Sequence, residues 1–253
     1  MVLALRQENG GSSSEFKFSK SDPFSTFLEL NCDLSDIGGH LNFFGYHAVL
    51  AHLVSLDGLD ILDQAQDQPR VFDLMGDHRY SIALDRLPGR VKSGRPESGS
   101  KESYRFNRSG NNFNIIYYPV VGGQATKSLI EIEGIPVRVA GSLELLASHL
   151  SLIPRMNDSR QARASNVALV YLLEREKCDV TEIAKSLPNQ YVRALTASLE
   201  DAENKPIVAG YSPSSSYIND LCAALKSISK PITRYLPVDR NELRLEASSS
   251  QPL

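Results

Sequence analysis

Residues 41–54 read LNFFGYHAVLAHLV, and this stretch decides the first half of the fold. The run from Leu41 to Phe44 is apolar and short, as in a β-strand, and Gly45 interrupts it. From Tyr46 to Val54 the apolar residues recur at helical spacing. The stretch therefore predicts a strand, a glycine turn and a helix in immediate succession.

More strands are expected on the C-terminal side of this unit, and one helix on its N-terminal side. Residues 79–84 alternate in a period of two, which favours a strand. Two hairpins are expected where paired apolar runs flank a turn, at 103–107 with 112–120 and at 129–132 with 135–139. Asp22-Pro23 is a typical helix start and predicts a helix over 24–30. The expected sheet has about five or six strands.

The pattern changes near residue 140, after which helical periodicity predominates. Helices are expected over residues 143–153, 158–174, 181–187, 190–202 and 217–228. The predicted fold class is α+β, with α/β also open: a mixed sheet with flanking helices over 23–140 and a helical bundle over 141–245. The Ser-rich and Gly-rich ends, residues 1–22 and 246–253, are expected to be disordered tails.

The composition is that of an ordinary globular protein and excludes several classes. Of 253 residues 42% are hydrophobic and 23% are charged, with a net charge of −3. These values exclude collagen-like and strongly disordered chains. Three widely spaced cysteines give neither a zinc motif nor a disulfide framework. Without a signal-peptide pattern or a long apolar span, a cytoplasmic protein that does not enter a membrane is expected.

Several catalytic and binding motifs are missing from the sequence. The five histidines form no metal-binding pair of the H-E-x-x-H type, and no G-x-S-x-G elbow is present. Neither a P-loop nor a G-x-G-x-x-G run occurs. One local charge feature stands out, since residues 86–108 hold seven basic and two acidic residues. This segment is either a solvated loop or a contact for nucleic acid or nucleotide phosphates.

The strand–glycine–helix unit is followed at once by DGLDILD, residues 57–63. In this order the chain resembles the minimal nucleotidyltransferase superfamily, particularly its AbiEii-like branch. The resemblance covers roughly residues 38–175. It implies a strand, a glycine pair that opens a helix, an acidic strand matched here by Asp57 to Leu62, and a later strand matched by 112–118.

The resemblance implies a site for Mg²⁺ and a nucleoside triphosphate. Asp60 would be the principal metal ligand and catalytic residue, with Asp57 or Asp63 as its partner. Gly45 would lie under the phosphates, and Arg79 would reach them. The reaction implied is transfer of a nucleotidyl group to RNA, a protein or a small molecule.

The sequence departs from the family pattern at the positions that would carry the chemistry. Tyr46 replaces the second glycine or serine, and the acids at 57, 60 and 63 are spaced by three rather than two. Residues three apart on a strand lie on opposite faces. Asn114 and Asn166 stand where further acids are expected. An active transferase and a catalytically dead relative both stay open, as do solvated turn or helix positions for the acids.

A second class of function also stays open. The protein could be a non-catalytic interaction or structural protein that docks a partner through its helical bundle, with the sheet in a structural role.

Overall fold

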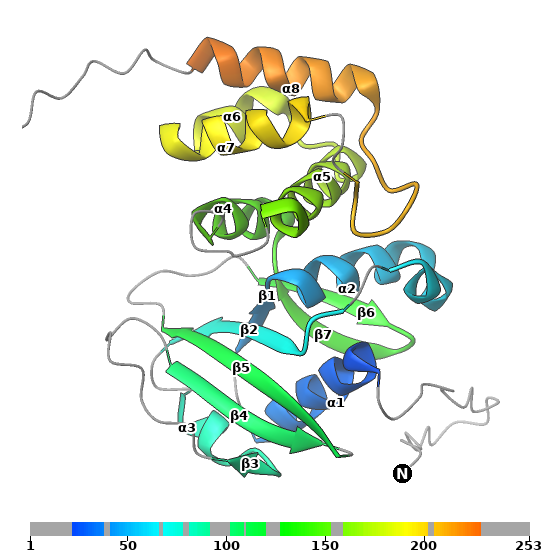
Figure 1. Ribbon diagram of the computed structural model, residues 1–253, viewed down its shortest axis with the longest axis vertical. Coiled ribbons are helices and arrows are strands. Elements are labelled where there is room, and N and C mark those ends of the chain that lie inside the picture. Colours follow the sequence, from blue (N-terminus) through cyan, green and yellow to red (C-terminus); the bar gives the residue numbers. More distant parts are fainter. Residues whose placement is uncertain are drawn as a thin grey trace, which may run out of the picture.

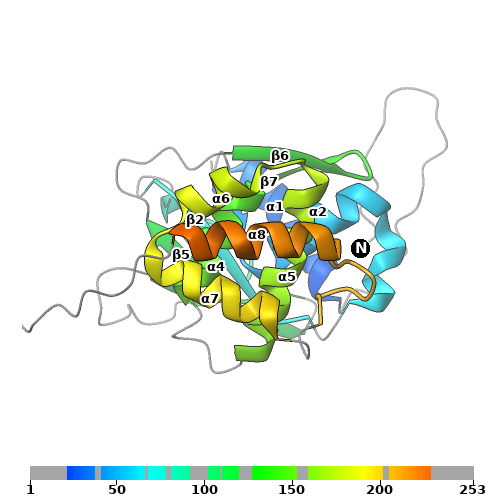
Figure 2. The same cartoon turned by 90° about the horizontal axis from the view of Figure 1, so that it is seen from above.

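The computed structural model describes residues 22–37, 41–65, 68–77, 81–91, 102–108, 110–119, 127–152, 159–201 and 205–228. The segments expected to be disordered tails lie outside these residues, apart from Asp22. The described strands all precede residue 141, and the later elements are helices, which stack at one end of the sheet (Figures 1 and 2). The predicted α+β class, a mixed sheet with flanking helices and a helical C-terminal part, is confirmed.

The sheet has seven strands in the order β3-β4-β5-β2-β1-β7-β6. β1 pairs antiparallel with β2 and parallel with β7, and β2 pairs parallel with β5, so the sheet is mixed. Both expected hairpins are present as β4 with β5 and β6 with β7. The strands are β1 Asn42–Phe44, β2 Val71–Gly76, β3 Arg90–Val91, β4 Glu102–Arg108, β5 Asn111–Pro119, β6 Lys127–Ile132 and β7 Ile135–Ala140.

Two of the helices, α1 and α6, begin at an aspartate that caps them. The Asp22 carboxylate accepts the Phe24 N–H at 3.0 Å, with Pro23 in the first turn of α1. Asp179 likewise accepts two N–H groups at the start of α6. The helices are α1 Pro23–Asp36, α2 Tyr46–Asp57, the 3₁₀ helix η1 Leu59–Gln64, α3 Ser81–Asp85, α4 Ser142–Leu152, α5 Ser159–Arg175, α6 Val180–Ser186, α7 Asn189–Glu200 and α8 Ser215–Ile228.

One face of the sheet is buried beneath α1 and α2. Phe27 of α1 lies 4.5 Å from the ring of Phe43, and His47 of α2 lies 4.6 Å from the ring of Phe72. Residues paired across neighbouring strands share a face, and Phe43, Leu74 and Tyr117 are paired in this way and fully buried. The core of the N-terminal part therefore lies between this face and the two helices.

Two predicted strands are wrong. Residues 57–62 are the end of α2 and the first turn of η1, because Gly58, with φ of 87°, ends one helix and the next turn tightens around buried Ile61. The strand over 79–84 is replaced from residue 81 by α3. Ile82 is 59% exposed while Leu84 is fully buried. On a strand these two side chains would share a face, so the short alternation did not define a strand.

Two strands were not predicted from the sequence, the two-residue β3 and the central strand β2. The side chains of β2 alternate between half-buried and buried along Val71–Gly76, as expected for a central strand with one open face. β2 pairs with both β1 and β5 and so joins the two halves of the sheet.

No helix in the described part of the chain has the length and hydropathy needed to cross a bilayer.

Candidate functional site

The turn between β1 and α2 brings a glycine and a carboxylate together. Gly45 has φ of 75°, a left-handed conformation that favours glycine. The pairing of β1 with β2 places Phe44 opposite Asp73. A Cβ atom on residue 45 would lie 2.4 Å from Oδ2 of Asp73. Two features therefore favour glycine at position 45: its positive φ, and the Asp73 carboxylate that fills the space where a Cβ would lie.

This turn, with the first turn of α2 and Asp73, is called the Gly45 corner below. The N-terminus of α2 lies here, and Gly45 as its cap residue offers no side-chain hydrogen bond. A helix N-terminus carries partial positive charge and directs backbone N–H groups toward a ligand. The corner thus combines a positive backbone end, a buried glycine that leaves room for a neighbouring carboxylate, and that half-buried carboxylate, Asp73.

The C-terminal helices touch the corner through His149 of α4. The ring is buried, with 4% exposed, and lies against the backbone of Gly45. Neither ring nitrogen makes a well-formed hydrogen bond within the described part of the chain. Burial lowers the pKa of His149 to about 4, and the nearby Gly45 backbone acts in the opposite direction. The His149 imidazole is therefore uncharged at neutral pH and packs against the corner without adding charge to it.

The sheet face that carries Asp73 is the open one. Phe44, Asp73, Ile116 and Ser103 form one row across four strands on this face. Phe44 is buried, while the other three are half-buried. The neighbouring row holds Val71, Asn114 and Arg105, of which the last two are exposed. Asp73 is the one carboxylate on this face among the described residues of β1, β2, β4 and β5.

An aromatic pair borders the same face. The rings of Phe44 and Tyr118 meet edge to face at 4.9 Å. Tyr118 is half-buried and lies opposite Met75, two residues along β2 from Asp73. The face beside Asp73 therefore offers an aromatic surface as well as a carboxylate.

The acids predicted from the sequence lie elsewhere. Asp57 ends α2, and Asp60 and Asp63 belong to η1; all three are exposed. Because α2 has 12 residues, its two ends are separated by about 18 Å. The expected grouping of these acids beside Gly45 is therefore not found. Asp57 instead neighbours Tyr211, whose pKa is raised to about 12 by burial and by this carboxylate.

The other residues singled out in the sequence have mixed outcomes. Arg79 lies outside the described residues. Asn114 is exposed on β5, on the face of Asp73, as an amide in place of a carboxylate. Asn166 is buried in α5 and donates to Ser198 Oγ at 3.1 Å. In the part of the chain that the structure describes, no cluster of three or more His, Cys, Asp or Glu residues could hold a metal ion.

Sequence reasoning missed Asp73. The available signal was the alternation of Val71 to Gly76 after Pro69, with an acid in the middle of an apolar strand. This strand begins at residue 71, after the strand–glycine–helix unit and after DGLDILD at residues 57–63. DGLDILD was matched to the acidic strand because it holds three acids.

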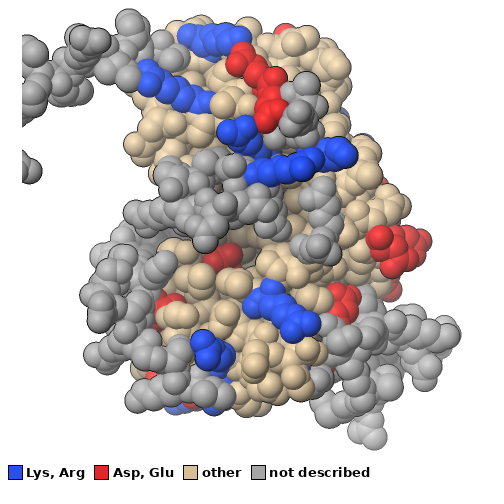
Figure 3. Space-filling view, viewed as in Figure 1, with Lys and Arg blue, Asp and Glu red and all other residues tan. Residues whose placement is uncertain are grey.

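Part of the basic segment 86–108 is used inside the fold. Arg90 pairs with Asp85, and its guanidinium lies 5.2 Å from the ring centre of Tyr104. Arg108 pairs with Glu29 at 2.6 Å and with a second acid of α1. In Figure 3 lysine and arginine side chains gather over the helices at the top, while charges of both signs are scattered over the sheet. Contact of this segment with nucleic acid stays a prediction.

Buried histidines give the stability of the fold a pH dependence. Burial lowers the pKa of His47 to about 3 and that of His149 to about 4, and it also lowers the pKa of His52. The unfolded chain binds these protons near pH 6.5 and the folded chain does not, so stability is complete above that pH and falls below it.

We expect the free energy of unfolding to fall by up to about 1.4 kcal/mol per pH unit for each of His47 and His149 between about pH 6.5 and 4, with a further loss from His52. Urea unfolding at about pH 7.5 and about pH 5 measures the loss. The variant His149→Leu should show a smaller loss than the wild type. Equal stability of the wild type at both pH values would contradict neutral burial.

Comparisons with known proteins give a likeness in structure only. No protein-family model matches the chain, and no curated protein matches it in sequence. Similar solved structures include an antigenic nucleotidyltransferase-like protein from Paracoccidioides brasiliensis, with 13% identity and a TM-score of 0.46 over 83% of this chain and 94% of that chain.

Two other structures are of the antibiotic-resistance factor ANT(2'')-Ia. Its solution structure has 9% identity and a TM-score of 0.41 over 90% of this chain and 97% of that chain. Its complex with adenylyl-2''-tobramycin has 12% identity and a TM-score of 0.40 over 81% of this chain and 97% of that chain. Likenesses of this size do not assign a function.

Proposed function

We propose that this protein is nucleotidyltransferase-like and binds a magnesium-bound nucleoside triphosphate at the Gly45 corner. The single observation that carries the proposal is the Asp73 carboxylate held against Gly45 at the N-terminus of α2. With this arrangement, β1, Gly45 and α2 match the strand, glycine turn and helix that the sequence resemblance requires. β2 then takes the place of residues 57–62 as the acidic strand.

The chemistry of the corner suits a triphosphate. The N-terminus of α2 favours negative charge, and Gly45 leaves room for the Asp73 carboxylate beside that helix end. Asp73 supplies one carboxylate oxygen ligand, and Mg²⁺ in such sites is held by one or two carboxylates together with phosphate oxygens and water. Arg105, exposed on the same face two strands away, adds positive charge for the phosphate chain.

The donor set fits a metal that arrives with the nucleotide rather than a resident metal. When bound, Mg²⁺ would neutralise phosphate charge. A two-metal transfer site uses several converging carboxylates, whereas Val71 and Met75 flank Asp73 on this face of β2 and Asn114 lies nearby on β5. Of the two forms left open by the sequence, we therefore favour the relative that binds nucleotide without efficient nucleotidyl transfer.

Isothermal titration with the magnesium salt of each nucleoside triphosphate tests the proposal. We expect the wild type to bind at least one of them with a Kd between about 1 μM and 1 mM. The variant Asp73→Asn keeps the shape and removes the charge, and it should bind at least about tenfold more weakly. The matched control Asp60→Asn should bind like the wild type.

The outcomes separate the possible sites. Absence of binding by the wild type would overturn the proposal. Loss of binding in Asp60→Asn but not in Asp73→Asn would instead locate the nucleotide at residues 57–63. Thermal melting of each variant distinguishes lost binding from lost folding.

Docking of a partner through the helical bundle has no comparable support. The large hydrophobic residues exposed in the described part of the chain are Leu56, Ile82 and Leu129, which lie on α2, α3 and β6. None of these three is on α4 to α8. The large exposed hydrophobic residues among the described residues therefore belong to the N-terminal sheet part of the protein.

A further inference from the structure

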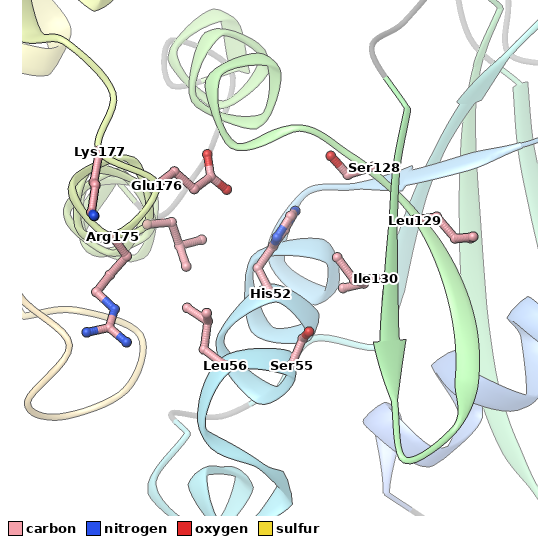
Figure 4. Close-up of a pocket in the computed structure, with 10 residues that line it drawn as sticks. His52, Ser55, Leu56, Ser128, Leu129, Ile130, Arg175, Glu176 and Lys177 are labelled. Atoms are coloured by element: carbon pink, nitrogen blue, oxygen red, sulfur yellow. The ribbon is translucent and has the colours of Figure 1, made fainter.

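A second site lies at the end of the sheet away from β3, between α2, β6 and the C-terminal end of α5. It is a pocket of about 600 Å³ (Figure 4). This volume is in the range of small-ligand and side-chain pockets. Its apolar wall includes Leu56, which is 45% exposed, together with Ile130 and Leu172. The pocket shares no lining residue with the Gly45 corner.

β6 is an edge strand, and its outer backbone faces this pocket. It is last in the strand order and pairs only with β7 among the described strands. The turn between them has positive φ at Glu133 (50°) and Gly134 (79°), as in a type I′ hairpin. Ile132 and Ile135 flank this two-residue turn as a pair, and the residues at these positions form backbone hydrogen bonds to each other. Along β6, residues that bond to β7 then alternate with residues that do not. The backbone N–H and C=O of Leu129 and Glu131 therefore point away from β7, toward the free edge.

The lining of the pocket agrees with this alternation. Ser128, Leu129 and Ile130 are consecutive and all line the pocket. In Figure 4 the side chains of Ser128 and Ile130 lie on the pocket side of β6, whereas that of Leu129 points away. Leu129 therefore reaches the pocket through its backbone, which makes the pocket continuous with the free edge of the strand.

The rim of the pocket is predominantly basic. Arg175 and Lys177 are exposed at the end of α5, and neither forms an ion pair with a described residue. The intervening carboxylate of Glu176 accepts a hydrogen bond from the Ser142 hydroxyl at 2.7 Å. His52 lies 3.1 Å from the Ala140 carbonyl oxygen through Nε2, and burial lowers its pKa. Two basic side chains and one acidic side chain line this part of the pocket, so its net formal charge is positive.

We propose that the free edge of β6 and the adjoining pocket bind an extended peptide segment of a partner protein in which an apolar and an acidic residue stand two positions apart, so that both side chains lie on the pocket face. The peptide backbone adds a strand to β6 by bonding the outward groups of Leu129 and Glu131. Peptide side chains opposite Ser128 and Ile130 enter the pocket, where an apolar one packs on Leu56 and an acidic one meets Arg175 and Lys177.

Fluorescence polarisation with labelled peptide pools tests this proposal. One pool contains octapeptides in which every second residue is Ser or Thr and the residues between are alternately apolar (Val, Ile, Leu or Phe) and acidic (Asp or Glu), which places both kinds on one face. The matched pool has Lys or Arg at the charged positions. The acidic pool should bind saturably below about 1 mM, and the basic pool at least about tenfold more weakly. The double variant Arg175→Ser with Lys177→Ser should remove this preference.

Two substitutions of Leu129 separate the contribution of its backbone N–H to peptide binding from that of its side chain. Leu129→Pro removes an outward N–H without removing a bond to β7, and it should weaken binding at least about tenfold. Leu129→Thr retains the N–H and should bind within about threefold of the wild type. In the wild type, hydrogen exchange should show peptide protection at the amides of Leu129 and Glu131, which needs no folded variant.

Three outcomes would overturn the proposal. The first is absence of saturable binding by the acidic pool. The second is protection by the peptide of other amides but not of Leu129 and Glu131. The third is a dimer of this chain that Leu129→Pro converts to monomer in light scattering, because a second copy would then be the occupant of the edge.

Discussion

Phe72→Ala is expected to destabilise the protein by about 3–5 kcal/mol, the range for removing a large aromatic side chain from a well-packed core. Phe72 is fully buried at the centre of the sheet. Its ring lies 4.6 Å from that of His47 and 5.6 Å from that of Phe113. It therefore joins α2 to the middle strands, and truncation leaves a cavity that helix and sheet cannot both close.

Urea unfolding at neutral pH measures this effect. Ile82→Ala is the control, because Ile82 is 59% exposed and should cost no more than about 1 kcal/mol. A loss below about 1 kcal/mol for Phe72→Ala would contradict the position of β2 in the core.

Gly45→Ala is expected to destabilise the protein by about 2–6 kcal/mol. With φ of 75° and ψ of −159°, residue 45 lies in a region restricted essentially to glycine, which costs a residue with a Cβ about 1–3 kcal/mol. The new Cβ would also lie 2.4 Å from Oδ2 of Asp73, so the carboxylate must move. Overpacking of this kind adds about 1–3 kcal/mol.

Gly58 supplies the matched control for backbone strain. Its φ of 87° and ψ of −178° lie in the same region as those of Gly45, and a Cβ there would meet nothing within 4 Å. Gly58→Ala should therefore cost only about 1–3 kcal/mol. Adding Asp73→Ala to Gly45→Ala should recover the part of the loss that comes from the carboxylate, which a double-mutant cycle isolates. Equal losses for Gly45→Ala and Gly58→Ala would show that Asp73 does not occupy the space beside Gly45.

The sequence predicted those parts of the fold that depend on local signals. The strand, glycine and helix of residues 41–54 became β1, Gly45 and α2, and the Glu133-Gly134 turn became the β6–β7 hairpin. The C-terminal helices fall within a few residues of the expected ranges. Periodicity and turn chemistry are set by neighbouring residues, so a single sequence carries them.

The candidate site depended on pairing between distant segments. Asp73 lies against Gly45 only because β2 pairs antiparallel with β1 in a register that places Phe44 opposite Asp73. No local pattern specifies that register. The three acids of residues 57–63 were conspicuous because they cluster in sequence, yet α2 carries them away from Gly45. The position of the carboxylate at the site is therefore determined by strand pairing, and the clustering of acids in the sequence did not predict it.

The central claim, a nucleotide at the Gly45 corner, is tested most directly by paramagnetic broadening in ¹⁵N–¹H spectra. Mn²⁺ replaces Mg²⁺ on the nucleoside triphosphate that titration identifies as bound. Because α2 separates its ends by about 18 Å, the corner and residues 57–63 are distinguishable. We expect the amide signals of Gly45 and Asp73 to broaden while that of Asp63 persists. Broadening centred on residues 57–63, with the Gly45 and Asp73 signals unchanged, would contradict the account.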